Sequence, residues 1–414
     1  MIMIWFAAPV AAPPLFAASP EAADSARAGI DALFSTHEQE LGTLLKPLEQ
    51  LAPDELAAIG GERIAAATAE AWEVNAETLA LLIPRQPTLV RALPPAGGAP
   101  SSANATAAAA ASKAADYSSP SNIIAHLVRD WSEEGDAGRA RTYRPVLRAL
   151  DALRRQQRVS SLRVLVPGAG ACRLAWEVAR VGHRVEANDA SIAMLHAART
   201  LMAAGTVDRA AAPRLFPRVR CAAGVMDRAA CLSSCAVGLP KPAGVSAWAR
   251  TPASASARPP LALTLQLGEW DRGYDAPGRA AGFDALLTSY FFDVLPDPSA
   301  TIRRARELLG PGGAWINVGP LLWHDAAAGL LRLSLREVRA LLLHHGFTLS
   351  TLKIIRKVPY LAGQPAARRP PRAGGGGGRR RLPLPWRREA QWLRSNGHDY
   401  DWHDVVFWVA RTPL

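Results

Sequence analysis

The spacing of hydrophobic positions changes along the chain. Between residues 27 and 85, apolar residues recur at helical intervals with polar residues between them, which predicts amphipathic helices. From residue 162 onward, short apolar runs such as residues 162–166 and 183–187 alternate with helical stretches. Strands that alternate with helices of this length indicate a parallel or mostly parallel sheet with helices on both faces. We therefore expect an α/β fold preceded by a helical region.

Segments without periodicity divide the chain. Residues 86–116 are rich in Pro, Ala, Ser and Gly, which is typical of a linker. Residues 219–260 and 361–397 interrupt the strands and helices, so we interpret them as insertions, with retained non-coding sequence as the alternative origin. The predicted organisation is an apolar, disordered N-terminus at 1–26, a helical region with its linker at 27–116, and an α/β domain at 117–414.

A glycine turn follows the first apolar run. Gly168 and Gly170 lie in the sequence Pro-Gly-Ala-Gly, and glycine without a Cβ lets the backbone approach a ligand closely. The helix after the turn offers unpaired N–H groups at its N-terminus. The next strand ends at Asp189, 19 residues beyond Gly170, where a carboxylate can accept hydrogen bonds from both hydroxyls of a ribose. These residues predict a nucleotide-cofactor site.

Arg173 bears on the identity of that cofactor. It stands where the dinucleotide fingerprint has its third glycine. S-adenosylmethionine has an adenosine ribose but no pyrophosphate to seat at the helix N-terminus, so Arg173 favours this cofactor over NAD. A Rossmann-type NAD(P)-dependent oxidoreductase stays the alternative.

Polar and turn residues recur at the ends of the predicted strands. Ligands of open α/β sheets bind outside the carboxyl ends of the parallel strands, so these residues are expected to share one layer. The set consists of Gly168, Asp189, Glu269, Tyr290, Asp293 and His324. Six such residues in one layer indicate a functional site more strongly than any one of them.

The charge of the chain is concentrated in one segment. The formal net charge is +12 over 414 residues, but residues 356–388 carry ten Lys or Arg and no acidic residue. We therefore expect a local basic insertion and no nucleic-acid partner. A non-catalytic RNA-binding protein that uses this arginine-rich insertion is the second alternative.

Cysteine usage and hydropathy indicate the cellular compartment in which the protein is expected. The four cysteines form neither a disulfide framework nor a zinc-finger spacing, so we expect a reducing compartment and no metal. Prolines interrupt the apolar residues 1–18, which argues against a membrane span and leaves a signal peptide as the alternative. The expected location is the cytoplasm, with the nucleus as a second compartment. A homodimer is one alternative for the oligomeric state.

Several longer motifs resemble one known family. They are Arg129-Asp-Trp-Ser-Glu-Glu-Gly135, Val164-Leu-Val-Pro-Gly-Ala-Gly170, Pro311-Gly-Gly-Ala-Trp-Ile-Asn-Val-Gly-Pro-Leu-Leu-Trp-His324 and Val405-Val-Phe-Trp-Val-Ala-Arg411. From about residue 123 to the C-terminus, apart from the two insertions, the chain resembles the carnosine N-methyltransferases. The resemblance implies a class I (Rossmann-like) methyltransferase domain with a seven-stranded, mostly parallel sheet. It also implies transfer of methyl from S-adenosylmethionine to an imidazole nitrogen of carnosine, giving anserine, or of another histidine-containing peptide.

The resemblance also assigns roles on the cofactor side. Arg129 would hold the methionine end of the cofactor, with His126 where the family usually has a glutamine. Asp189 would bind the ribose in place of the usual glutamate. The remaining cofactor-binding residues implied are Gly168, Gly170, Glu269, Trp270 and Tyr290.

On the substrate side, the resemblance implies two catalytic residues, Asp293 and His324. The substrate-binding positions implied are Phe291, Asp293, His324, Tyr360, Tyr400 and Trp402. The Phe-Phe-Asp run is one residue shorter than the family pattern, and Trp402 replaces a tyrosine, so substrate choice follows less directly than the fold. Four of these residues also have structural alternatives: Asp293 as a helix cap, His324 as a partner of backbone groups, and Tyr400 and Trp402 as core aromatics.

Overall fold

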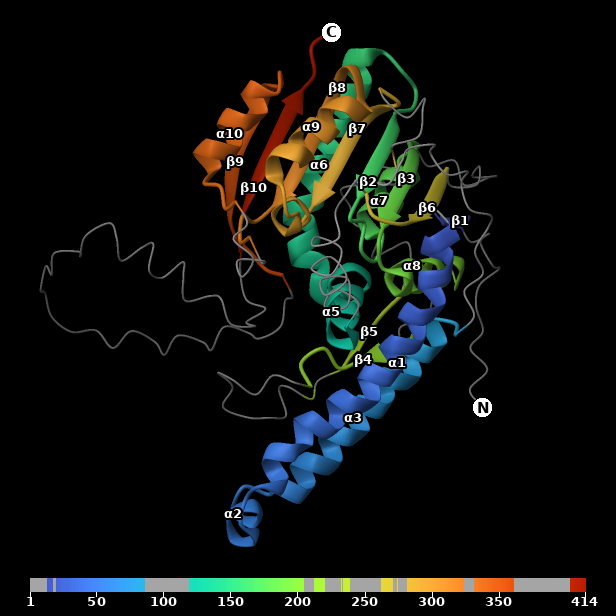
Figure 1. The fold of residues 1–414 in the computed structure, drawn as a ribbon, viewed down its shortest axis with the longest axis vertical. Helices are drawn as coiled ribbons and strands as arrows, with labels where there is room; N and C mark the ends of the chain where they lie inside the picture. Colours follow the sequence, from blue (N-terminus) through green and yellow to red (C-terminus); the bar gives the residue numbers. More distant parts are fainter. Residues whose placement is uncertain are drawn as a thin grey trace, which may run out of the picture.

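The structure is a computed structural model of the chain (Figure 1). It describes residues 13–17, 20–85, 119–204, 212–219, 232, 234–238, 262–270, 274, 281–323, 331–360 and 403–414. The linker at 86–116 and the arginine-rich insertion at 361–397 lie outside these residues, as does most of the insertion at 219–260.

One eight-stranded sheet forms the centre of the fold. In spatial order its strands are β1 (Leu15–Ala17), β6 (Leu263–Leu267), β3 (Arg184–Asp189), β2 (Arg163–Pro167), β7 (Phe283–Ser289), β8 (Leu309–Gly319), β10 (His403–Arg411) and β9 (Thr348–Val358). Only β10 runs antiparallel to its neighbours, β8 and β9. The expected α/β fold with a mostly parallel sheet is confirmed.

The helices fall into an N-terminal group and a group that packs on the sheet. The first group is α1 (Pro20–Glu49), α2 (Pro53–Ala58) and α3 (Gly61–Leu82). The second group is α5 (Pro120–Trp131), α6 (Asp136–Gln157), α7 (Arg173–Arg180), α8 (Ile192–Ala204), α9 (Pro298–Leu308) and α10 (Leu335–His344). Short elements complete the described fold: η1 (Glu133–Gly135), η3 (Phe292–Val294) and the two-stranded pair β4 (Arg214–Leu215) and β5 (Cys235–Ala236).

Two apolar clusters cover the two faces of the sheet. Alternate residues of a strand point to opposite faces. Along β2, Val164 and Val166 belong to the cluster formed with α5 to α8, whereas Leu165 belongs to the cluster formed with α9 and α10. Trp408 of β10 likewise faces α9 and α10 and is fully buried. The strands between the two clusters are therefore held rigidly, with their ends fixed relative to one another.

The N-terminus differs from the sequence-based expectation. Residues 1–26 were expected to be disordered, but β1 and the first turns of α1 lie within them. β1 pairs in parallel with β6, with Leu15 opposite Leu265, and makes the sheet eight-stranded where seven strands were expected. The physical reason is that a short apolar segment satisfies the open edge of β6 and buries Leu15 completely.

α1 and α3 pack side by side as a long hairpin that projects away from the sheet (Figure 1). The His37 ring stacks on Trp72 with centroids 4.5 Å apart. The Trp72 indole N–H donates to the His37 carbonyl at 2.9 Å, which fixes the register of the two helices. The predicted helical N-terminal region is thus confirmed, although α1 begins before residue 27. Among the described residues, no helix is both long and apolar enough to cross a bilayer.

Candidate functional site

The glycine turn lies between the end of β2 and the start of α7. Gly168 and Gly170 have φ angles of 58° and 53°, in the left-handed region that favours glycine. A Cβ on Gly168 would lie 1.9 Å from the Phe291 ring, so no side chain fits there. The Ala169 N–H donates to the Asn188 carbonyl at 2.9 Å, which holds the turn against the end of β3.

Asp189 fixes this turn from the end of β3. Its Oδ2 accepts a hydrogen bond from the Gly170 N–H at 2.7 Å, and its Oδ1 accepts one from the Ser191 N–H at 2.8 Å. Burial raises the pKa of the carboxyl, and these two N–H groups oppose the shift. A carboxylate has about four acceptor positions, so Asp189 retains capacity to accept ribose hydroxyls.

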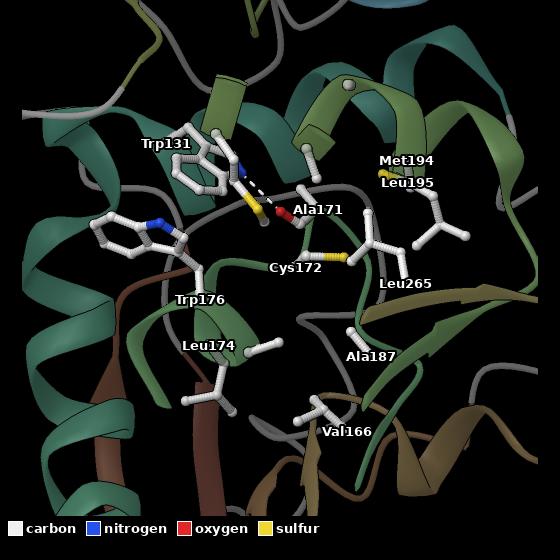
Figure 2. Close-up of a cluster of buried hydrophobic side chains, with 14 of the residues drawn as sticks. Trp131, Val166, Ala171, Cys172, Leu174, Trp176, Ala187, Met194, Leu195 and Leu265 are labelled. Carbon is white, nitrogen blue, oxygen red and sulfur yellow. Dashed lines mark hydrogen bonds between the residues drawn. The ribbon is translucent and has the colours of Figure 1, made fainter. Parts of the chain in front are cut away.

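The core beneath the turn is formed by α5 and α7. Trp131 and Trp176 pack edge to face with centroids 5.8 Å apart, beside Cys172 and Leu174 (Figure 2). The Trp131 indole N–H donates to the Ala171 carbonyl at 2.7 Å. The turn is therefore anchored both to β3 and to the C-terminal end of α5.

Arg129 reaches the site from the last turn of α5. Its Nε and Nη2 donate to the two oxygens of Asp130 at 2.8 and 3.0 Å, and its Nη1 donates to the Tyr360 hydroxyl at 2.9 Å. Burial opposes ionisation of both Arg129 and Asp130, yet their pairing raises the pKa of Arg129 and lowers that of Asp130. The ion pair is therefore charged at neutral pH.

The Arg129 guanidinium has donors to spare toward the glycine turn. It carries five N–H donors, and its hydrogen bonds to other described residues use three of them, so that among these residues Nη1 and Nη2 each keep one. Nη2 lies 3.7 Å from where a Gly170 Cβ would stand. Two neighbouring N–H groups of a guanidinium form the fork that binds a carboxylate through both oxygens.

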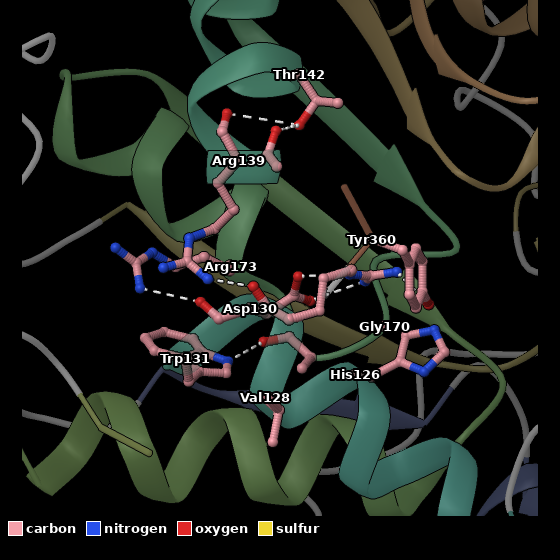
Figure 3. A network of polar contacts seen from close by, with 12 residues as sticks. His126, Val128, Asp130, Trp131, Arg139, Thr142, Gly170, Arg173 and Tyr360 are labelled. Carbon is pink, nitrogen blue, oxygen red and sulfur yellow. Dashed lines mark hydrogen bonds and ion pairs between the residues drawn. The ribbon is translucent and has the colours of Figure 1, made fainter. Parts of the chain in front are cut away.

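Two more arginines support this arrangement from behind (Figure 3). Arg139 donates to the carbonyls of Arg129 and Ser132 and to Asp136. Arg173 donates to the Asp130 carbonyl at 3.0 Å, forms an ion pair with Glu177 at 2.8 Å and is 4% exposed. The arginine that replaces the third glycine of the dinucleotide fingerprint therefore ties α7 to α5.

His126 lies one turn before Arg129 on α5. Its Nδ1 is 2.8 Å from the Asn122 carbonyl and donates to it, so Nε2 is the acceptor of the neutral ring. Burial, with a contribution from Arg129, lowers the pKa of His126 to about 4. The ring edge lies 3.4 Å from where a Gly170 Cβ would stand, which places a neutral hydrogen-bond acceptor at the turn.

The residues expected at the adenine follow β6 directly. The Gly268 N–H donates to the Asp189 carbonyl at 3.0 Å, so β6 ends beside β3. Trp270 is 5% exposed, and its ring meets Phe291 edge to face at 6.2 Å. Glu269, between these two residues, is exposed.

Aromatic rings from three strand ends meet on the other side of Arg129. Tyr290 follows β7 with a φ of 54°, and its ring lies 5.5 Å from Tyr360 and 6.4 Å from His403. The Arg129 guanidinium lies over Tyr290 and Tyr360, 5.5 and 5.1 Å from their centroids. Arg129, Tyr290 and Tyr360, together with neighbouring groups of α6, line a small pocket.

His403 is a site residue that the sequence interpretation missed. Because β10 is antiparallel, its first residue lies at the edge where the parallel strands end. The ring of His403 lies 5.7 Å from Tyr360, and His403 pairs with Val358 in the sheet. Its place follows from the antiparallel direction of β10, which the sequence analysis did not predict.

Asp293 lies in η3, directly after β7 and Phe291. It is 3% exposed, and its Oδ2 accepts a hydrogen bond from the Leu322 N–H at 2.9 Å. The next helix, α9, is capped by Asp297, whose Oδ1 accepts from the Ala300 N–H at 2.9 Å. The helix-cap alternative for Asp293 is therefore wrong: the carboxylate links the ends of β7 and β8.

The structure brings most of the expected residues to one edge of the sheet. His126, Arg129, Gly168, Gly170 and Asp189 surround the glycine turn, while Tyr290, Phe291, Asp293 and Tyr360 lie beside it. Three expected substrate residues, His324, Tyr400 and Trp402, lie outside the described residues. Within the described part of the chain, no three His, Cys, Asp or Glu side chains are grouped as metal ligands would be.

Comparisons with known proteins bear on the family of the chain. The carnosine N-methyltransferase family model matches residues 107–368. The carnosine N-methyltransferase of Mus musculus is 28% identical over 237 residues, covering 56% of this chain and 55% of that protein. That of Dictyostelium discoideum is 26% identical over 247 residues, covering 59% and 50%. The chain thus spans about half the length of the curated relatives it matches.

Among solved structures, the chain resembles Haemonchus contortus phosphoethanolamine N-methyltransferase 2 in complex with S-adenosyl-L-methionine. The identity is 12% and the TM-score 0.31, over 61% of this chain and 49% of that one. A similarity this weak does not establish the fold class. The fold class rests instead on the strand order of the sheet. The family match, in contrast, covers more than half of the 414 residues. The chain belongs to the carnosine N-methyltransferase family.

Proposed function

We propose that this protein is an S-adenosylmethionine-dependent N-methyltransferase whose acceptor is an imidazole nitrogen of carnosine or of another histidine-containing peptide. The observation that carries the proposal is the position of Arg129 and Asp293 at the same edge of the sheet. Arg129 faces the glycine turn with two N–H donors to spare, and Asp293 follows the neighbouring strand. The Arg129 guanidinium lies over the rings of Tyr290 and Tyr360, and burial, with a contribution from Asp293, raises the pKa of both phenols.

The residues around the turn fit the cofactor. The Arg129 fork would bind the carboxylate of its methionine end, and the neutral Nε2 of His126 would accept from its ammonium group. Gly170 would let the cofactor approach the backbone of the turn, where Gly168 is already packed against Phe291. Asp189 would accept hydrogen bonds from the ribose hydroxyls. Glu269 and Trp270 would flank the adenine. When bound, the cofactor supplies a methyl group on a positively charged sulfur.

On the acceptor side, the residues of the chain orient the imidazole and hold its proton. A neutral imidazole nitrogen is a fair nucleophile near pH 7, so the main task is to align its lone pair with the methyl group. Asp293 would accept the N–H of the other ring nitrogen, which selects the tautomer and stabilises the positive charge that develops. Phe291 and Tyr290 would stack on the ring of the cationic product.

The roles of His324, Tyr400 and Trp402 stay predictions from the sequence. His324 follows Leu322 by two residues, and Leu322 donates its N–H to Asp293. The connection from β8 therefore passes the proposed catalytic carboxylate. We propose that His324 acts with Asp293 on the acceptor.

The test is transfer of labelled methyl from S-adenosylmethionine to carnosine, with β-alanyl-alanine as the matched acceptor that lacks an imidazole. We expect label on carnosine and none on β-alanyl-alanine. Binding of S-adenosylhomocysteine, measured by calorimetry, shows whether the cofactor site is intact. Intact cofactor binding with no label on carnosine or on any other histidine-containing peptide contradicts the proposal.

The two alternatives make different predictions. An oxidoreductase would bind NAD, whereas we expect calorimetry to detect S-adenosylhomocysteine and no NAD; family membership favours this outcome. An RNA-binding protein would depend on the arginine-rich insertion. Deletion of residues 364–390 should abolish RNA binding under that alternative and leave methyl transfer unchanged under ours. Location in the cytoplasm or nucleus, and a homodimer, stay predictions.

A further inference from the structure

We propose that Tyr360 is a positioning residue that couples the two halves of the site, so that cofactor and acceptor each strengthen binding of the other. The inference rests on the proposed function, because it requires both ligands to bind at the edge formed by β2, β7 and β9. It assigns to Tyr360 more than contact with the substrate.

The cofactor half reaches Tyr360 through Arg129. The Arg129 Nη1 donates to the Tyr360 hydroxyl at 2.9 Å, across 231 residues of sequence, and the guanidinium lies 5.1 Å from the ring centroid. Because Asp130 holds the Nε and Nη2 edge, the N–H groups left for a cofactor carboxylate are on the same two nitrogens that face Tyr360 and Gly170. Only the Arg129 guanidinium would therefore separate a ligand bound to it from the Tyr360 hydroxyl.

The acceptor half reaches the same ring through two other aromatic side chains. Tyr360 meets the rings of Tyr290 and His403 at 5.5 and 5.7 Å. Burial raises the pKa of the Tyr360 phenol, with Asp130 and Asp293 adding to the shift and Arg129 opposing it. The phenol thus stays protonated at neutral pH. Its oxygen accepts a hydrogen bond from Arg129, so its hydrogen can be donated to the molecule that accepts the methyl group.

The backbone of Tyr360 allows the ring little freedom to separate from Arg129. A Cβ on Gly138 of α6 would come within 2.3 Å of the Pro359 carbonyl, so the chain before Tyr360 packs directly on α6. Within the described part of the chain, the Tyr360 hydroxyl has one hydrogen bond, which Arg129 donates. Whichever ligand binds first fixes the direction of the Tyr360 hydroxyl hydrogen, and the second ligand then loses less conformational freedom. Such coupling is reciprocal by thermodynamic necessity.

The experiment measures carnosine binding by calorimetry, with and without saturating S-adenosylhomocysteine, which cannot donate a methyl group. We expect the wild-type Kd for carnosine to fall at least about five-fold when S-adenosylhomocysteine is present. In Tyr360→Phe, which keeps the ring and loses the hydroxyl, the two Kd values should agree within about two-fold. If S-adenosylhomocysteine lowers the Kd for carnosine by the same factor in Tyr360→Phe and in the wild type, the proposal is overturned.

Tyr143→Phe is the matched control. The Tyr143 hydroxyl donates to Asp130 at 3.3 Å, so this variant disturbs the same buried network without touching the link to Tyr290 and His403. It should keep the wild-type coupling; equal loss of coupling in both variants would show a general structural effect and overturn the specific role. If wild-type carnosine binding is uncoupled, only this inference fails. If carnosine does not bind while S-adenosylhomocysteine does, the proposed function fails with it.

Discussion

The two halves of the site are held in place by different means. On the cofactor side, Arg129, Gly170 and Asp189 are fixed by hydrogen bonds and an ion pair among α5, β2 and β3. On the acceptor side, Tyr290 and Tyr360 meet mainly through ring contacts between strand ends. Hydrogen bonds to charged groups set direction and distance more tightly than ring contacts do. Under the proposed function, we infer from this difference a cofactor half that is preorganised and an acceptor half that is completed when its ligand binds.

Removal of the buried carboxylate should have the largest effect, because it breaks the preorganised half. We expect Asp130→Ala to lower the free energy of unfolding by about 3–5 kcal/mol, since it leaves the buried Arg129 charge unpaired. Urea denaturation measures the loss. Asp151→Ala on α6 is the control, because Asp151 forms exposed pairs with Arg154 and Arg155 and should cost less than about 1 kcal/mol. Similar losses of unfolding free energy in Asp130→Ala and Asp151→Ala would contradict the distinction between the Arg129–Asp130 pair and the more exposed pairs of Asp151.

Asp293 tests the acceptor half separately. Asp293→Asn keeps an oxygen for the Leu322 N–H but loses the charge that stabilises the imidazolium, so kcat should fall about 10²- to 10⁴-fold. The Kd for S-adenosylhomocysteine should stay within about two-fold of wild type. Asp297→Asn, four residues along, preserves the cap of α9 and should leave kcat unchanged. Parallel loss of cofactor binding in Asp293→Asn would show that the halves are not separable.

The two glycines of the turn offer a finer comparison. Both have positive φ, so alanine is strained at either position, but only at Gly168 would the Cβ overlap the Phe291 ring. At Gly170 the nearest atom is 3.4 Å away, an ordinary contact. Calorimetry should show the Kd for S-adenosylhomocysteine raised at least about ten-fold in Gly168→Ala and by less in Gly170→Ala. The reverse order would contradict the role of Phe291 at the turn.

The smallest expected effect concerns the protonation of His126. Its pKa is about 4 in the folded protein and about 6.5 when unfolded, so the unfolded state binds the proton first as the pH falls. Between pH 6.5 and 4, the wild type should therefore lose stability relative to His126→Gln. Urea denaturation at pH 7.5 and 5 should show a relative loss of roughly 1–2 kcal/mol at the lower pH. A pH-independent difference would contradict a neutral, buried His126.

Much of the cofactor half could be predicted because its residues are close in sequence. Gly168, Gly170 and Asp189 lie within one strand-turn-helix-strand unit, whose periodicity fixes which ends meet. The mostly parallel sheet followed from the same alternation. The capping box of α10 is equally local, because its residues, Ser334 and Glu337, are three positions apart.

The acceptor half was less predictable because its contacts are long-range. Nothing local to Tyr360 indicates that its hydroxyl meets Arg129, 231 residues earlier. His403 gains its place from the antiparallel direction of β10, and Leu15 gains its strand only because β6 has an open edge. Such contacts depend on the assembled sheet, not on the propensity of the residues involved.

The most direct test of the central claim is the chemical identity of the product. Wild-type protein is incubated with S-adenosylmethionine and carnosine, and the product is identified by NMR. We predict anserine, with the new methyl group on an imidazole nitrogen. A methyl group on the β-alanine amine or on a carboxylate would contradict the account, as would unchanged carnosine beside a bound cofactor.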